Sequence, residues 1–288
     1  MIYYCLLGFS IILAVVKSSF VKQYINRGSE QNSRIFIFNL IAYGIAALIQ
    51  LAVSGFPLIS SWTILPAMGY AFSCYLMQLF LMKSMAVGSM ALSSLFCMYG
   101  MLIPTLAGPI FFHESFSLWQ GLGVLLMILS IFFSTDIEKK NSSINQSWLA
   151  FALLTLLFSG MVGVFEKIHQ SGPDKSEIPS FLSYAFILIV VLNAITLVMS
   201  KKQETKPISP KEGLLFAILT GIVVVIYNRV NLTLAGSLDT MLYYPVANGG
   251  AILLTLLVSI GIFREPLRRN HILCFIFGIS AILLLSIG

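Results

Sequence analysis

Apolar runs of about 20 residues recur along the whole of this 288-residue sequence. As an α-helix rising about 1.5 Å per residue, a run of that length crosses the ~30 Å hydrocarbon core of a bilayer. Only 10% of the residues are charged, against about a quarter in soluble domains. We therefore predict an all-α integral membrane protein with ten transmembrane helices. The predicted spans are residues 2–21, 35–54, 63–82, 89–112, 117–135, 148–167, 180–200, 213–232, 238–262 and 270–287.

The segment that joins the fourth and fifth spans recurs at half the chain length. Glu114 stands in the sequence FHES, and Glu265 stands in the sequence FREP 151 positions later. The sequences FVK and FEK, 145 positions apart, repeat in the same order. The chain is therefore predicted to consist of two related five-helix halves, residues 1–136 and 148–288, joined by a polar linker at residues 137–147.

Basic residues are distributed unevenly between alternate loops. Of the 17 Lys and Arg residues, 14 fall on one side of the predicted spans, and Lys167, Lys175 and Arg229 fall on the other. Because basic loops stay cytoplasmic, we predict that both termini lie outside the plasma membrane and that the linker lies inside. With five spans in each half, the second half enters the membrane from the opposite face. This pattern predicts an inverted repeat, which secondary transporters use with a substrate site where the halves meet.

The sequence contains few residues at spacings that would suit a catalytic or metal-binding site. The four cysteines lie in apolar spans without paired spacing, and no combination of His, Cys, Asp and Glu has a workable catalytic spacing. The net charge of +6 follows from membrane topology and does not indicate nucleic acid. We therefore predict no enzymatic activity, no metal, no cofactor and no nucleic-acid partner.

Polar side chains inside the predicted spans are the candidates for binding a substrate. Gln78 and Asn228 occupy related positions in the third and eighth spans, where they either orient a polar solute or hydrogen-bond neighbouring helices. Arg229 follows directly, and a charge inside a membrane costs ~3 kcal/mol or more unless it faces a cavity or a partner. Two interpretations stay open for Arg229: it lines a cavity, or it extends to the outer headgroups. His113 and His169 are expected to be solvated.

Tyrosines are more frequent in four of the spans than two interfacial belts require. Aromatic rings with a polar tip suit a cavity for a planar or cationic solute, although tyrosine is also enriched at membrane surfaces. Asn248, beside two glycines, is a packing position that also offers an opening for substrate. The tyrosines concerned are Tyr70, Tyr75, Tyr99, Tyr227, Tyr243 and Tyr244.

Charged residues near the ends of the spans are assigned structural roles. Glu114 and Glu265 stand at predicted helix starts, where a carboxylate meets the positive end of the helix dipole. We predict that both form structural joints by capping a helix. Lys17, Glu166 and Lys167 are interpreted as anchors at the membrane surfaces.

The repeated joints, the glycines that follow them and the sequence KSMAVGS from Lys83 resemble the EamA family of the drug/metabolite transporter superfamily over nearly the whole chain. Residues 244–263 are also similar to the third span of the small multidrug resistance proteins, which are relatives of one half. The resemblance implies a substrate cavity between the halves, lined by the first, third and fourth spans of each, and alternating access. It also places a proton-coupling carboxylate eight residues before a lysine, where this sequence has Ala14 and Ser159. Proton antiport through that carboxylate is therefore not predicted, and the coupling ion stays open.

The predicted function is that of a secondary transporter in the plasma membrane. It moves a small organic metabolite or drug-like solute, in the export direction that the resemblance favours, as a monomer or a homodimer. Amino acids, nucleoside-like compounds and amphiphilic cations all fit an aromatic, partly polar cavity. Two alternatives on the same scaffold stay open, namely a flippase for a lipid or lipid-linked intermediate and a non-transporting assembly factor. A lateral opening towards lipid would favour the flippase, and a dry interface would favour the assembly factor.

Overall fold

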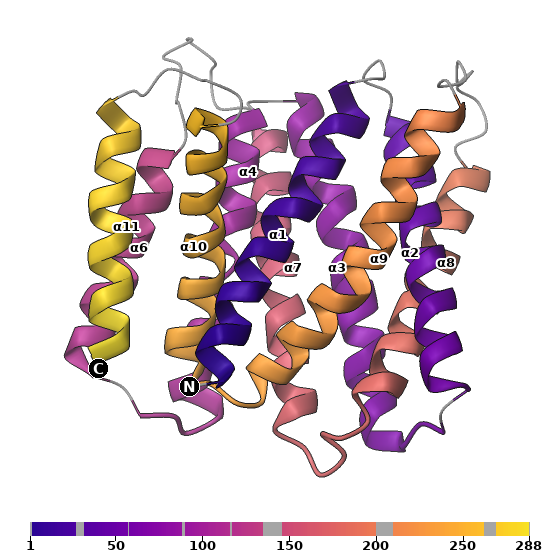
Figure 1. Cartoon of the computed structure of the whole chain (residues 1–288), viewed down its shortest axis with the longest axis horizontal. Coiled ribbons are helices and arrows are strands. Elements are labelled where there is room, and N and C mark those ends of the chain that lie inside the picture. The colour runs from indigo at the N-terminus through magenta and orange to yellow at the C-terminus, as the bar shows by residue number, and fades with distance from the viewer. Residues whose placement is uncertain are drawn as a thin grey trace.

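A computed structural model (Figure 1) describes residues 2–26, 32–56, 58–87, 90–115, 117–134, 146–199, 210–261 and 269–287. These residues form eleven α-helices and, within the same ranges, no β-strand. The helices are α1 (Ile2–Asn26), α2 (Asn32–Ser54), α3 (Ser61–Val87), α4 (Met90–Tyr99), α5 (Leu102–Phe111), α6 (Leu118–Ser134), α7 (Gln146–Gln170), α8 (Ile178–Met199), α9 (Pro210–Ala235), α10 (Thr240–Gly261) and α11 (Arg269–Ile287).

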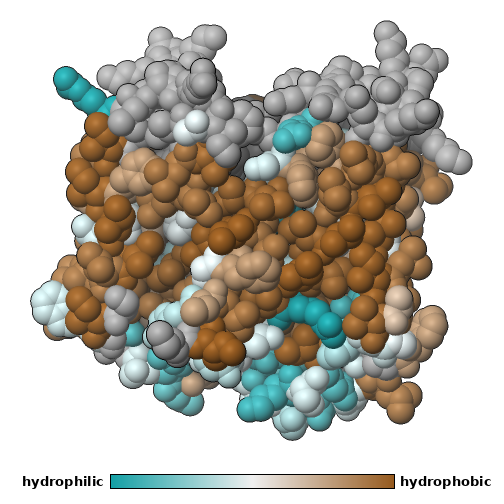
Figure 2. Space-filling model, in the orientation of Figure 1, coloured by the Kyte–Doolittle hydropathy of each residue, from teal (hydrophilic) through white to brown (hydrophobic). Residues whose placement is uncertain are grey.

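Length and composition identify a membrane protein. Six of the described helices contain a segment long and apolar enough to cross a bilayer, in α1, α2, α3, α7, α8 and α9. Shorter apolar helical segments occur at Phe96–Phe111, Leu118–Phe133 and Ile272–Leu285. The space-filling view shows a broad hydrophobic face, with hydrophilic residues gathered at its lower edge (Figure 2). The predicted class, an all-α membrane protein, is confirmed.

The run 89–112, predicted as one span, folds as two short helices with a turn at Gly100 and Met101. The carbonyl of Cys97 accepts hydrogen bonds from the Gly100 N–H (3.2 Å) and from the Ser159 hydroxyl of α7 (2.8 Å). An ideal Cβ on Gly100 would lie 2.6 Å from Cβ of Ser159, so glycine permits this close approach. A helix break at membrane depth is tolerated because the neighbouring helix supplies the missing donor.

Helices from distant parts of the chain pack in pairs. The most extensive described pairs are α3 with α7, α6 with α11, α2 with α8, α1 with α9, α2 with α9 and α3 with α8; α5 packs mainly on α10. Helix α1 begins, and α11 ends, at the lower edge of the view in Figure 1. The connections after α5, α7 and α9 lie at the same edge.

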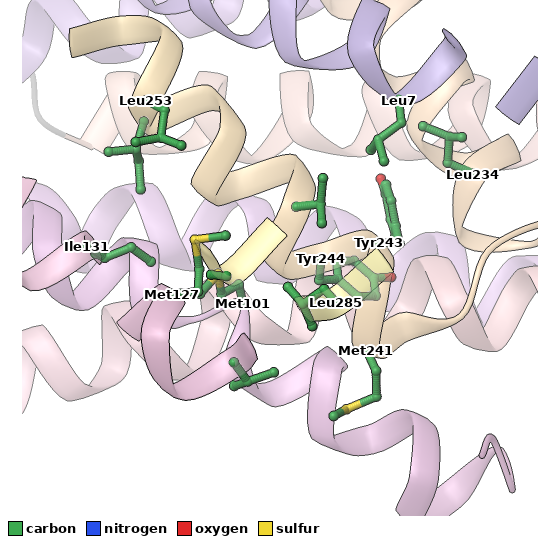
Figure 3. Close-up of a cluster of buried hydrophobic side chains, with 14 of the residues drawn as sticks. Leu7, Met101, Met127, Ile131, Leu234, Met241, Tyr243, Tyr244, Leu253 and Leu285 are labelled. Atoms are coloured by element: carbon green, nitrogen blue, oxygen red, sulfur yellow. The ribbon is translucent and has the colours of Figure 1, made fainter. Parts of the chain in front are cut away.

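The described bundle has two large hydrophobic cores. One joins α1, α6, α10 and α11 and is drawn in Figure 3, with Met127, Tyr243 and Leu285 among its members. The other joins α2, α3, α8 and α9, with Phe181 and Phe186 fully buried in it. The last turns of α7 touch both cores, since the Tyr244 hydroxyl of the first core donates to its backbone and Phe165 packs against the second. This position determines the surroundings of the site described next.

Candidate functional site

Glu166, one turn before the end of α7, is a buried carboxylate between the two cores. Its residue surface is only 5% exposed, and among the described residues it has no hydrogen-bond or ion-pair partner. Its electrostatic neighbours are Tyr70 and Cys74 of α3 and Tyr243 and Tyr244 of α10. A charged side chain in a membrane interior is costly unless it serves a pathway or a partner, so Glu166 marks a functional site by default.

Lys17 of α1 supplies a positive charge to the same region. Its Nζ lies 4.3 Å from the centroid of the Tyr227 ring of α9, which is cation–π geometry. Lys17 is the positive charge that acts on the Glu166 carboxyl, yet the two do not form an ion pair within 4.0 Å. The site therefore contains one acidic and one basic group that do not pair with each other.

Asn228 extends this site towards α3. The Tyr70 hydroxyl donates to Oδ1 of Asn228 at 2.6 Å, and Nδ2 of Asn228 donates to the Val224 carbonyl at 2.8 Å. Its repeat-related partner Gln78 accepts from Nδ2 of Asn39 on α2 at 2.7 Å. Both amides thus bridge helices at buried or half-buried positions, Asn228 through Tyr70 and Gln78 through Asn39.

Two adjacent tyrosines form the wall of the site on α10. The rings of Tyr243 and Tyr244 have centroids 4.6 Å apart, and Figure 3 shows their hydroxyls pointing in different directions. The Tyr244 hydroxyl donates to the Gly163 carbonyl of α7 at 2.6 Å. An ideal Cβ on Gly163 would lie 2.7 Å from Cε1 of Tyr244, so only glycine admits this contact. We name the assembled group the Glu166 cluster; it consists of Lys17, Tyr70, Glu166, Tyr227, Asn228, Tyr243 and Tyr244.

Besides Gln78 and Arg229, three predicted site residues lie outside the Glu166 cluster. The Tyr75 hydroxyl is bonded to Thr196 of α8. The Tyr99 hydroxyl donates to the Ile128 carbonyl of α6 at 3.1 Å. Asn248 is exposed, and its Nδ2 donates to the Tyr244 carbonyl of its own helix at 2.9 Å. Tyr75 and Tyr99 thus bond to residues outside the cluster, and, among the described residues, Asn248 bonds only to the backbone of Tyr244.

Arg229 points away from its neighbour Asn228. It is half-buried and lines an open groove of about 340 Å³ together with Leu6, Ile178, Val230 and Thr233. Ile222 and Ile226, which precede it by seven and three residues on α9, are each 41% exposed. Residues spaced in this way share one helix face, so Arg229 lies on the exposed, apolar stripe of α9.

Glu114, in the connection between α5 and α6, joins three segments of the chain. Oε1 pairs with Nζ of Lys167 on α7, and Oε2 accepts from the backbone N–H (2.7 Å) and hydroxyl (2.6 Å) of Thr240, the first residue of α10. The helix start that Glu114 meets is thus that of α10. The following helix, α6, is capped by Ser117 and Gln120. Glu265 and most of the linker 137–147 lie outside the described residues.

Three interpretations from the sequence are wrong. Glu166 and Lys167 are only 5% and 9% exposed, so neither is an anchor at the membrane surface. His169 is fully buried, with Nε2 3.3 Å from the Thr63 hydroxyl and Nδ1 3.0 Å from Nε2 of Gln170. His113 is exposed, as predicted. The missed signal was a carboxylate inside an otherwise apolar run, which is a functional hypothesis in itself.

Comparison with known proteins supplies the fold without a function. No family model matches the sequence. A Haemophilus influenzae protein described as uncharacterized is 24% identical over 189 residues, which is 62% of this chain and 60% of that protein. This chain thus spans about 60% of the length of that relative. A solved crystal structure of a protein has a TM-score of 0.79 at 11% identity, covering 98% of this chain and 96% of the other. The same fold therefore exists in a solved structure.

Proposed function

We propose that this protein is a secondary transporter that moves a small organic solute across the plasma membrane by alternating access. The observation that carries the proposal is the Glu166 cluster, in which a buried carboxylate and a half-buried lysine face aromatic walls without pairing to each other. Buried charges without a structural partner mark substrate and ion pathways in membrane proteins. The proposed family is the EamA branch of the drug/metabolite transporter superfamily, with ten spans and both termini outside.

The pairing of helices supports two inverted halves. If residues 1–136 and 148–288 are equivalent, then α1, α2 and α3 correspond to α7, α8 and α9. The contact of α1 with α9 is then equivalent to the contact of α7 with α3. The contacts of α2 with α8 and of α6 with α11 each join a helix to its equivalent in the other half. A two-fold axis in the membrane plane produces this pattern, and transporters of this type bind substrate where the repeats meet.

The chemistry of the Glu166 cluster indicates the class of solute. Separate acidic and basic groups are complementary to a solute that carries both a cationic and an anionic group, with Glu166 receiving the first and Lys17 the second. The rings of Tyr243 and Tyr227 offer flat apolar surface to the remainder of the solute. A zwitterion of amino-acid size fits this arrangement best.

The test is an untargeted mass-spectrometric comparison of medium and cell extract. Four strains are compared: one overproducing the wild type, one lacking the protein, one carrying Glu166→Gln, and one carrying Asp174→Asn, which removes a carboxylate from the connection after α7. A solute should shift between medium and cytoplasm with the wild type and Asp174→Asn, and should not shift with Glu166→Gln. If no solute shifts in any strain, the transport proposal is contradicted, and the lipid fractions then test the flippase alternative.

A further inference from the structure

The groove beside Arg229 combines one positive charge with apolar walls. It has a volume of about 340 Å³ and is lined by α1 at Leu6, by the first residue of α8 at Ile178, and by Arg229, Val230 and Thr233 of α9. In Figure 2 a hydrophilic patch interrupts the apolar face beside the lower half of α9. The groove is separate from the Glu166 cluster because Asn228 and Arg229 point to different sides of α9.

The Arg229 guanidinium has no hydrogen-bond or ion-pair partner in the part of the chain that the structure describes. The carboxylate nearest in sequence to the groove is Glu177, which accepts instead from the backbone N–H (3.1 Å) and hydroxyl (3.0 Å) of Ser60. Glu114 is likewise occupied, by Lys167 and Thr240. A guanidinium carries five donors that suit a planar pair of anionic oxygens. The protein therefore leaves these donors open to an anion from outside.

The depth of the groove favours a lipid as the source of that anion. Arg229 precedes the end of α9 by six residues, and Leu6 follows the start of α1 by four, which are about 9 Å and about 6 Å along the helices. Ile178 starts α8 at the same edge of the bundle. All the lining residues thus lie near the helix ends, where headgroups meet acyl chains, and long basic side chains extend towards that boundary.

We propose that this groove is a binding site for an anionic phospholipid. The phosphate pairs with the Arg229 guanidinium through charge-assisted hydrogen bonds, and an acyl chain lies along Leu6, Ile178 and Val230. Basic pockets between transmembrane helices bind anionic headgroups on the cytoplasmic side of membranes; with both termini outside, as proposed above, this groove offers the same chemistry at the outer edge of the bundle. The site does not depend on the proposed transport, since it lies outside the Glu166 cluster.

Native mass spectrometry of the full chain in detergent tests the site, with phosphatidylglycerol and phosphatidylcholine of matched acyl chains as probes. The wild type should retain phosphatidylglycerol about tenfold more strongly than phosphatidylcholine, which corresponds to about 1.4 kcal/mol. Arg229→Gln should lose this preference. Arg229→Lys should keep part of it, because lysine retains the positive charge but lacks the planar guanidinium that donates two parallel hydrogen bonds to a phosphate. Lys175→Gln removes an exposed positive charge from the same edge of the bundle and should behave as the wild type.

A second variant separates lost binding from lost folding. Thr233→Phe keeps Arg229 but fills the groove, so it should also weaken phosphatidylglycerol binding about tenfold, while both variants keep the melting profile of the wild type. Equal binding of the two lipids by the wild type would overturn the proposal, as would a preference that survives Arg229→Gln or Thr233→Phe. Displacement of the lipid by millimolar inorganic phosphate would instead identify a site for free phosphate, which also contradicts a lipid site.

Discussion

Glu166 and Lys167 are adjacent on α7 and buried to a similar extent, 5% and 9% exposed, yet their surroundings differ completely. Lys167 forms an ion pair with Glu114, which in turn receives two hydrogen bonds from Thr240. Glu166 faces tyrosines of α3 and α10 and has no hydrogen-bond or ion-pair partner among the described residues.

The difference teaches that burial alone does not separate a structural charge from a functional one. A buried charge whose partners are all present stabilises a particular arrangement of helices. A buried charge without partners costs free energy, and a protein retains it when a ligand or an ion supplies the partner. On this basis Lys167 belongs to the architecture and Glu166 to the proposed transport site.

The largest expected effect comes from breaking the structural pair. Lys167→Met leaves the Glu114 carboxylate buried without a counter-charge, which should lower the free energy of unfolding by about 3–5 kcal/mol. Denaturant or thermal unfolding in detergent measures the change. The double variant Glu114→Gln/Lys167→Met should recover most of the loss, because a glutamine still accepts from Thr240. Equal stability of the single and double variants would show that the ion pair contributes nothing.

The second effect sharpens the contrast at the neighbouring position. Glu166→Gln should reduce solute transport in proteoliposomes about 100-fold, or about 2.8 kcal/mol, because the cationic group of the solute loses its partner. Stability should stay unchanged or rise, since the variant removes an unpaired buried carboxyl group. Melting curves recorded on the same preparations provide the control. A loss of stability as large as that of Lys167→Met would mean that Glu166 is also structural.

A smaller effect concerns the hydrogen bond that attaches Asn228 to the Glu166 cluster. Tyr70→Phe removes the hydroxyl that donates to Oδ1 of Asn228, and an unsatisfied buried acceptor costs about 1–3 kcal/mol. Unfolding midpoints measure this loss. Tyr244→Phe, which removes a hydroxyl bonded to the Gly163 carbonyl, is the matched control and should cost a similar amount. An unchanged unfolding midpoint for Tyr70→Phe would indicate that Oδ1 of Asn228 accepts a hydrogen bond from another donor.

The smallest effect is a dependence of stability on pH at Glu177. The backbone N–H of Ser60, then the Thr63 side chain and, less strongly, the Ser60 hydroxyl hold the pKa of Glu177 below its ordinary value of 4.5. A lowered folded-state pKa contributes stability that is present above about 4.5 and is lost as the pH falls through the folded pKa. Melting temperatures of the wild type should therefore fall slightly more on acidification than those of Glu177→Gln. Parallel acid profiles of the two proteins would contradict this assignment.

Much of the helical framework was predictable from the sequence. The run 180–200 folds as Ile178–Met199, and the run 213–232 lies within Pro210–Ala235. The break between α4 and α5 was not predicted, because it depends on the Ser159 hydroxyl of a helix about 60 residues away. The cap of α6 had a local signal, since Ser117 and Gln120 have the spacing of a capping box.

The sequence predicted which types of residue form the candidate site, but it did not predict which individual residues come together there. Asn228, Tyr227 and Tyr243 fall in the Glu166 cluster, whereas Tyr75 and Tyr99 bond to other helices. Sequence spacing shows which residues share a helix face, but it does not show which helix lies opposite. The same limit explains why Arg229 and Asn228, adjacent in sequence, serve different surfaces.

The sequence by itself determined that the chain enters a membrane as helices, because apolar length and the need to satisfy backbone hydrogen bonds leave no other structure in lipid. Only the tertiary structure decided which charges are paired. Glu114 finds Thr240, 126 positions away, and Glu166 finds no partner in the described chain. The physical reason is that the free energy of a buried ionisable group depends on the groups within a few ångströms of it. Those groups come from helices that are distant in sequence and are brought together only by tertiary packing.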